Sequence, residues 1–142
     1  MLYVTLMILV GCLTAIQPPI NTALSRTVGV LESSFISFAC GALFLGLATL
    51  FFGRGQIWRL TEAPSWQWIG GIFGAIMVLN TIIAVPRIGV LTTAMAMIFG
   101  NMLMAAIIDN YGWFSVPVTP FGWRRLLGFI LVLAGLALVF RR

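Results

Sequence analysis

Charge is scarce in this chain of 142 residues: only 8% of them are charged, histidine is absent, and the eight basic residues are all arginine. A soluble domain carries about 25% charged residues, which cover its surface. With 61% hydrophobic residues and three acids, the sequence excludes a soluble globular domain and a disordered chain. The arginines stand singly or in pairs between long apolar runs. They therefore flank membrane segments, and we expect no nucleic-acid partner.

The usual groups of enzyme chemistry are also missing. The chain has no histidine, no GxSxG or HExxH motif, no glycine loop for phosphate and no close pair of carboxylates. Acid–base or nucleophilic catalysis needs such groups close together, so we expect no enzyme and no cofactor. Cys12 and Cys40 lie inside apolar runs, which argues against a disulfide framework and against a metal site.

Long apolar runs are what the sequence does contain. A membrane helix needs about 20 mostly apolar residues to cross about 30 Å of hydrocarbon. Five runs meet or approach this length, at residues 2–24, 31–52, 66–85, 89–108 and 126–140. A cleaved signal peptide is not expected, because the first run lacks a basic segment before it. The sequence predicts an all-α integral membrane protein with one transmembrane domain over residues 1–142.

The arginines give no orientation to these five spans. An odd number of spans puts the termini on opposite sides; side A holds the N-terminus and side B the C-terminus. Four arginines fall on side A and four on side B: Arg54, Arg59, Arg124 and Arg125 against Arg26, Arg87, Arg141 and Arg142. Because arginine-rich loops stay in the cytoplasm, this balance leaves two interpretations. Either a weaker cue sets one orientation, or the chain inserts both ways and two copies pair antiparallel.

The aromatic residues favour the second interpretation. All five tryptophans and both tyrosines lie on or near side A. These side chains prefer the membrane–water interface, so an antiparallel pair would give both interfaces an aromatic belt.

Polar side chains on one face of the first span are the main candidates for a site. Thr14, Gln17, Asn21 and Ser25 follow spacings of 3, 4 and 4, which place them on one helical face. Pro18 and Pro19 break the backbone hydrogen bonding there and predict a kink. The face either lines a wet cavity or bonds neighbouring helices.

Further polar residues occur in the next three spans. We add Ser37, Asn80, Thr93 and Asn101 to Gln17 and Asn21 as candidate substrate-binding residues. At 1.5 Å per residue, four of these six lie at a common level, roughly 6–8 Å from the bilayer centre toward side B: Gln17, Ser37, Asn80 and Thr93. An antiparallel partner would supply a mirrored layer, which suits alternating access. The fifth span has no polar side chain, so it is expected to be peripheral or to pack in a dimer.

No acid lies in the middle of any span. Glu32 begins the second span, where a carboxylate suits a helix N-terminus, and Asp109 ends the fourth as a candidate interfacial residue. Both remain candidates for ion coupling.

Several stretches, taken in order, resemble one family. They are residues 11–24 (GCLTAIQPPINTAL), Ser37-Phe38 with Gly41, residues 84–89 (AVPRIG), Gly100-Asn101, residues 109–112 (DNYG) and residues 124–128 (RRLLG). The chain is similar throughout to the YdcZ-type branch of bacterial inner-membrane proteins in the drug/metabolite transporter superfamily.

This resemblance implies a five-helix half of a ten-helix transporter, formed by antiparallel dimerisation in the inner membrane. It implies that the polar positions of the family correspond in this chain to Gln17, Asn21 and Ser37. Asn101 departs from the family, which has glutamine there, and the first span lacks the glutamate of the small multidrug transporters.

The sequence thus predicts a secondary transporter, acting as an exporter, for a small polar or zwitterionic metabolite. Its expected partners are membrane lipid, the small-molecule substrate, and a second antiparallel copy or a paralogue. The alternative is a non-transporting membrane scaffold or partner subunit, in which the polar stripes only hold helices together.

Overall fold

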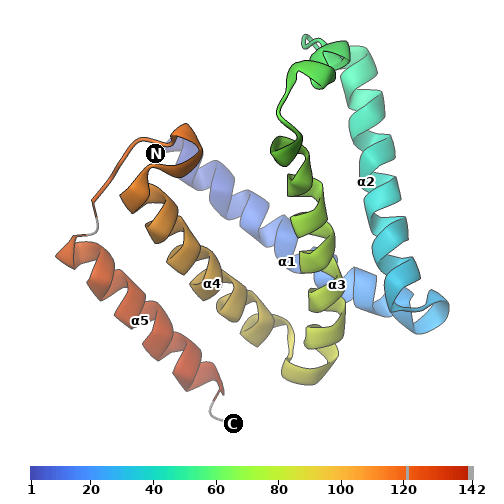
Figure 1. Cartoon of the computed structure of the whole chain (residues 1–142). Coiled ribbons are helices and arrows are strands. Elements are labelled where there is room, and N and C mark those ends of the chain that lie inside the picture. The colour runs from blue at the N-terminus through green and yellow to red at the C-terminus, as the bar shows by residue number, and fades with distance from the viewer. Residues whose placement is uncertain (121, 141–142) are drawn as a thin grey trace. The chain divides into compact units, whose positions relative to one another are not determined.

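The described part of the chain folds into helices joined by short connections. A computed structural model describes residues 1–120 and 122–140 (Figure 1). The five α-helices are α1 (Leu2–Val28), α2 (Val30–Phe52), α3 (Gly70–Ile88), α4 (Val90–Tyr111) and α5 (Trp123–Phe140). Three short 3₁₀ helices lie in the connections: η1 (Ile57–Glu62), η2 (Ser65–Ile69) and η3 (Trp113–Ser115). No strand occurs in the described ranges, which confirms the all-α prediction.

Four of the helical segments have the length and composition of membrane spans: Leu2–Val28, Val30–Phe52, Ser65–Ile88 and Val90–Tyr111. They correspond to the first four apolar runs. Their apolar side chains are largely exposed, and among the described residues only Val78 and Ile82 are buried hydrophobics. Such exposure of apolar side chains is what a lipid solvent allows, because lipid tails cover outward-facing leucine as well as a protein core does.

The helices form two compact units, Met1–Arg87 and Ile88–Arg142. That the whole chain acts as one transmembrane domain stays a prediction.

In the first unit, Gly29 forms the connection between α1 and α2. Its N–H donates to the Ser25 carbonyl at 3.0 Å, and its own carbonyl accepts from the Ser33 N–H at 3.0 Å. One residue thus ends α1 and begins α2, and the two helices contact each other beside it. Helix α1 continues through Pro18 and Pro19, which both lie inside it.

Helix α3 belongs, up to Arg87, to the same unit as α1 and α2 (Figure 1). The Phe38 ring of α2 reaches α3 at Gly74, where an added Cβ would lie 3.2 Å from Cζ of Phe38. Glycine at this position therefore leaves room for the aromatic ring, as the sequence pattern of small residues indicates.

The second unit consists of α4 and α5, which run antiparallel and pack against each other (Figure 1). Phe99 and Phe129 meet edge to face, with ring centroids 6.5 Å apart and planes at 78°. An added Cβ at Gly135 would lie 3.5 Å from Cε of Met95, so this glycine of α5 faces α4.

Candidate functional site

Buried polar side chains gather on both sides of the α1–α2 turn. Asn21, Thr22, Ser33 and Ser34, called here the polar cluster, are all buried, with Ser33 fully so. They lie at the end of α1 and the start of α2, which the single-residue turn at Gly29 brings together.

Hydroxyl groups in and beside this cluster donate to backbone carbonyls. Ser33 Oγ donates to the Asn21 carbonyl at 2.7 Å and so links α2 to α1. Ser34 Oγ donates to the Val30 carbonyl at 2.9 Å, and Ser25 Oγ to the Thr22 carbonyl at 2.8 Å. These three bonds use the hydroxyl protons and leave the side chains of Asn21 and Thr22 uninvolved.

Asn21 and Thr22 carry polar atoms that are buried without a partner. Their residues are 5% and 6% exposed, and neither Asn21 Nδ2 nor Thr22 Oγ1 forms a hydrogen bond. A buried polar group without a partner costs about 1–3 kcal/mol. The amide nitrogen offers two N–H donors and the hydroxyl one more, so the pair is equipped to bind an acceptor group.

The other predicted site residues are less enclosed. Gln17 and Asn101 are exposed and Ser37 is half-buried. Asn80 is exposed and donates its amide to the Ile76 carbonyl at 2.8 Å, one turn back in α3. Thr93 is buried, and its hydroxyl donates to the Gly89 carbonyl at 2.7 Å.

The six candidates are divided between the two units. Four belong to the first unit, whereas Thr93 and Asn101 belong to the second. Their convergence on one substrate, and the kink at Pro18 and Pro19, stay predictions.

The two acids proposed for ion coupling have distinct surroundings. Glu32 is exposed in the first turn of α2, and its carboxylate lies over Gly29. Asp109 pairs with Arg125 at 3.2 Å, and its backbone carbonyl accepts from the Thr119 N–H at 2.9 Å. Both positions suit structural roles at helix ends, and their part in coupling stays a prediction. No cluster of potential metal ligands occurs among the residues that the structure describes.

Thr22, Ser33 and Ser34 belong to the polar cluster but were not among the predicted site residues. A signal was present, since Thr22 follows Asn21 directly and the Ser33-Ser34 pair stands on the other side of Gly29. The polar spacing within a single span does not reveal this signal, because the two polar pairs lie in different spans.

Four helical segments of spanning length and apolar composition define the class: a multi-pass membrane protein. The sequence model of one family, described as "Putative inner membrane exporter, YdcZ", matches residues 2–138. The chain belongs to this family and is a multi-pass protein of the inner membrane. The family description is that of a transporter rather than an enzyme. No curated protein and no solved structure gives a match.

Proposed function

We propose that this chain is a secondary transporter that exports a small polar or zwitterionic metabolite. Two copies pair antiparallel as a dual-topology homodimer, and each contributes one five-helix half of a ten-helix carrier of the drug/metabolite transporter type. Alternating access then exposes the substrate site to each side in turn.

The unpartnered amide nitrogen of Asn21 is the observation that supports this proposal. Polar groups at membrane depth are expensive and usually have a partner or a function. Asn21 Nδ2 is buried and has none, and Thr22 Oγ1 beside it has none either. A substrate oxygen, such as the carboxylate of a zwitterion, is the acceptor that these donors require.

The placement of the acids supports a neutral or zwitterionic substrate rather than a simple cation. Glu32 lies in the first turn of α2, Glu62 ends η1, and Asp109 lies near the end of α4. A cation carrier needs a carboxylate within the spans to balance the charge of its substrate.

We also propose that α5 crosses the membrane as the fifth span. Its 18 residues extend about 27 Å, close to the hydrocarbon thickness. Its two arginines stand in the first turn, where they reach the interface.

The scaffold alternative is favoured by one observation, the bond from Ser33 Oγ to the Asn21 carbonyl at 2.7 Å. This bond joins two helices and needs no substrate. It leaves Asn21 Nδ2 without a partner, however, so packing alone does not account for that nitrogen.

Flux measurements in proteoliposomes test the proposal. Purified protein is reconstituted and assayed with a panel of amino acids, betaines, polyols and organic cations. Asn21→Leu and Thr22→Val remove the unpartnered atoms with little change in volume. Thr49→Val is the matched control, because the exposed Thr49 hydroxyl donates to the Leu45 carbonyl of its own helix.

We expect Asn21→Leu and Thr22→Val each to reduce flux of a polar substrate about tenfold or more, the effect of one lost hydrogen bond. Their thermal stability should stay level or rise, because an unpaired polar group has been removed. Thr49→Val should transport normally. Unchanged flux in both cluster variants, or a loss of flux that follows a loss of stability, would favour the scaffold.

A further inference from the structure

The connection between α2 and α3 is amphipathic. In a 3₁₀ helix three residues make one turn, so side chains three positions apart lie on the same face. Ile57 and Leu60 of η1 share one face and are 72% and 51% exposed. Arg59 and Glu62 share another face, and Trp58, on the remaining one, is 73% exposed. Helix η1 therefore presents apolar side chains on one side and an ion pair on another.

Both ends of this connection are tied to membrane spans. The span of α2 ends at Phe52, and the next candidate span begins at Ser65. Trp66 and Trp68, at the start of that second span, are 51% and 52% exposed. Because tryptophan at the end of a span prefers the membrane–water interface, residues 53–64 are held at the level of the lipid headgroups. The exposed apolar face of η1 is thus placed beside lipid.

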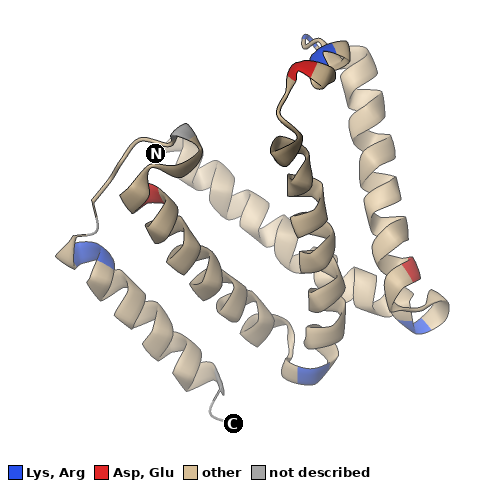
Figure 2. Ribbon diagram, viewed as in Figure 1, with Lys and Arg blue, Asp and Glu red and all other residues tan. Residues whose placement is uncertain are grey.

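Charged side chains of the same connection line a shallow hollow. Arg54, Gln56, Arg59 and Glu62 contribute to its walls, and Figure 2 shows the acidic and basic residues of this connection together. Arg59 donates from Nε to Glu62 Oε2 at 2.8 Å and also pairs with it through Nη2 at 2.7 Å. Arg54 is exposed and, within the described ranges, forms neither an ion pair nor a hydrogen bond. The hollow therefore keeps one positive charge, that of Arg54.

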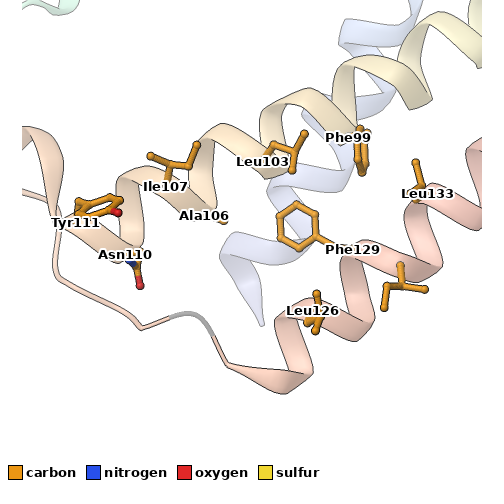
Figure 3. A pocket seen from close by; sticks show the side chains of 10 residues that line it. Phe99, Leu103, Ala106, Ile107, Asn110, Tyr111, Leu126, Phe129 and Leu133 are labelled. Atoms are coloured by element: carbon orange, nitrogen blue, oxygen red, sulfur yellow. The ribbon is translucent and has the colours of Figure 1, made fainter.

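The groove between α4 and α5 has no such charge. Its lining is apolar apart from Asn110 and Tyr111, and none of the described residues that line it is charged (Figure 3). An apolar lining of this kind does not distinguish one headgroup from another. The hollow beside η1 combines a cation with an apolar face, and this combination selects for a ligand with both properties.

We propose that the hollow and η1 together bind one anionic phospholipid, with its phosphate on Arg54 and an acyl chain against Ile57 and Leu60. Guanidinium groups bind phosphate oxygens through paired N–H donors, and basic residues next to a membrane span attract anionic lipids. Phosphatidylglycerol carries one negative charge, which matches the charge of the hollow. A soluble anion would leave Ile57 and Leu60 in water, so a lipid satisfies both parts of the surface. This site does not depend on the proposed function.

Native mass spectrometry and photocross-linking of the full-length protein test this site. Protein in detergent is titrated with phosphatidylglycerol and phosphatidylethanolamine, and the lipid retained per protomer is counted. Arg54→Gln removes the phosphate contact and Arg54→Lys keeps its charge, while Arg26→Gln is the matched control in the last turn of α1. Ile57→Asn makes the apolar face polar, and Thr61→Asn is its control at an exposed position of η1.

We expect the wild type to retain one phosphatidylglycerol per protomer in preference to phosphatidylethanolamine. Arg54→Gln should weaken that retention about fivefold, the effect of one arginine beside an anionic headgroup, and Arg54→Lys should keep most of it. Ile57→Asn should weaken retention of both lipids, whereas Arg26→Gln and Thr61→Asn should behave as the wild type. Phosphatidylglycerol with a photoreactive headgroup should cross-link to the wild type within residues 53–64.

Equal retention of the two lipids by the wild type would overturn the proposal, because the hollow would then not recognise charge. A loss in Arg54→Gln no greater than that in Arg26→Gln would also overturn it, since diffuse attraction explains such a result. Full displacement of the lipid by glycerol phosphate, with no effect of Ile57→Asn, would indicate a soluble ligand instead. A cross-link outside residues 53–64 would place the lipid elsewhere, and this measurement requires no variant to fold.

Discussion

At the scale of single residues, Gly29 has a backbone conformation that only glycine adopts readily. Its φ of 102° and ψ of 162° lie in a region closed to residues with a Cβ. An added Cβ would also collide with the Glu32 carboxylate, which lies over this turn. The close approach of the two halves of the polar cluster depends on this single residue.

We predict that Gly29→Ala lowers the free energy of unfolding by about 1–3 kcal/mol, the cost of such backbone strain. Denaturant titration in bicelles measures this change. Gly46→Ala is the control, because an added Cβ there meets nothing within 4 Å. Equal stability of the two variants would show that the turn at Gly29 can adopt another conformation.

The candidate site was predictable in part. The polar stripe of the first span includes Asn21, but it favours Gln17 more strongly as a site residue, and Gln17 is exposed. Helical spacing identifies a face and does not say where along it a neighbouring helix comes close. Asn80 illustrates a second limit, because its amide bonds to the Ile76 carbonyl of its own helix. A hydrogen bond of this kind, to a carbonyl of the same helix, satisfies the polar side chain, and the sequence contains no pattern that predicts it.

At the scale of elements, a small polar network closes the connection between α4 and α5. Arg125 contacts Asp109 at 3.2 Å, the Thr119 hydroxyl at 3.0 Å and the Thr119 carbonyl at 3.3 Å. The Thr119 N–H in turn donates to the Asp109 carbonyl at 2.9 Å. Gly112, in the left-handed conformation, turns the chain out of α4 into this connection. The network therefore joins the start of α5 to the end of α4.

We predict that Arg125→Ala opens this connection while Arg124→Ala does not. Limited proteolysis of protein in detergent should cut between residues 112 and 122 several times faster in Arg125→Ala. The change in stability should be small, under about 1 kcal/mol, because the pair is partly exposed. Arg124→Ala is the neighbouring control and should keep the wild-type rate. Equal rates in all three proteins would mean that the network does not restrain the loop.

Apolar runs located the helices well and their ends less well. The first run stops near residue 24, whereas α1 continues to Val28; the third begins near residue 66, whereas α3 begins at Gly70 after a 3₁₀ turn. An apolar run indicates which residues contact lipid. A helix, in contrast, continues for as long as its backbone hydrogen bonds are favourable. Helices therefore extend into the polar interface, and glycine or proline decides where they stop.

At the scale of the whole molecule, the charged residues that the structure describes lie near the ends of the helices or in the connections between them. In the first unit, Arg26 lies in the last turn of α1 and Arg87 in that of α3, while Arg54 and Arg59 lie in the connection between α2 and α3. Arg59 pairs with Glu62 at 2.7 Å, but acids contribute little to orientation. On the predicted five-span topology each side carries four arginines, so small changes in arginine number should be enough to decide the orientation.

We predict that two double variants fix opposite orientations. Arg54→Gln with Arg59→Gln leaves side B richer in arginine and should hold the C-terminus in the cytoplasm. Arg26→Gln with Arg87→Gln should hold it outside. A cysteine appended to the C-terminus, in a Cys12→Ser, Cys40→Ser background, is labelled from each side of the membrane. The wild type should label from both sides, and each double variant from one.

Flux measurements on the same double variants test whether an antiparallel pair is the working unit. If an antiparallel pair is the working unit, each double variant alone supplies only one orientation and should lose most of its flux. Expressed together, the two should restore it, because one copy of each completes the pair. A control that combines each variant with itself at twice the dose should stay inactive. Full flux from either variant alone would show instead that a parallel pair or a single chain suffices, and would contradict the dual-topology dimer directly.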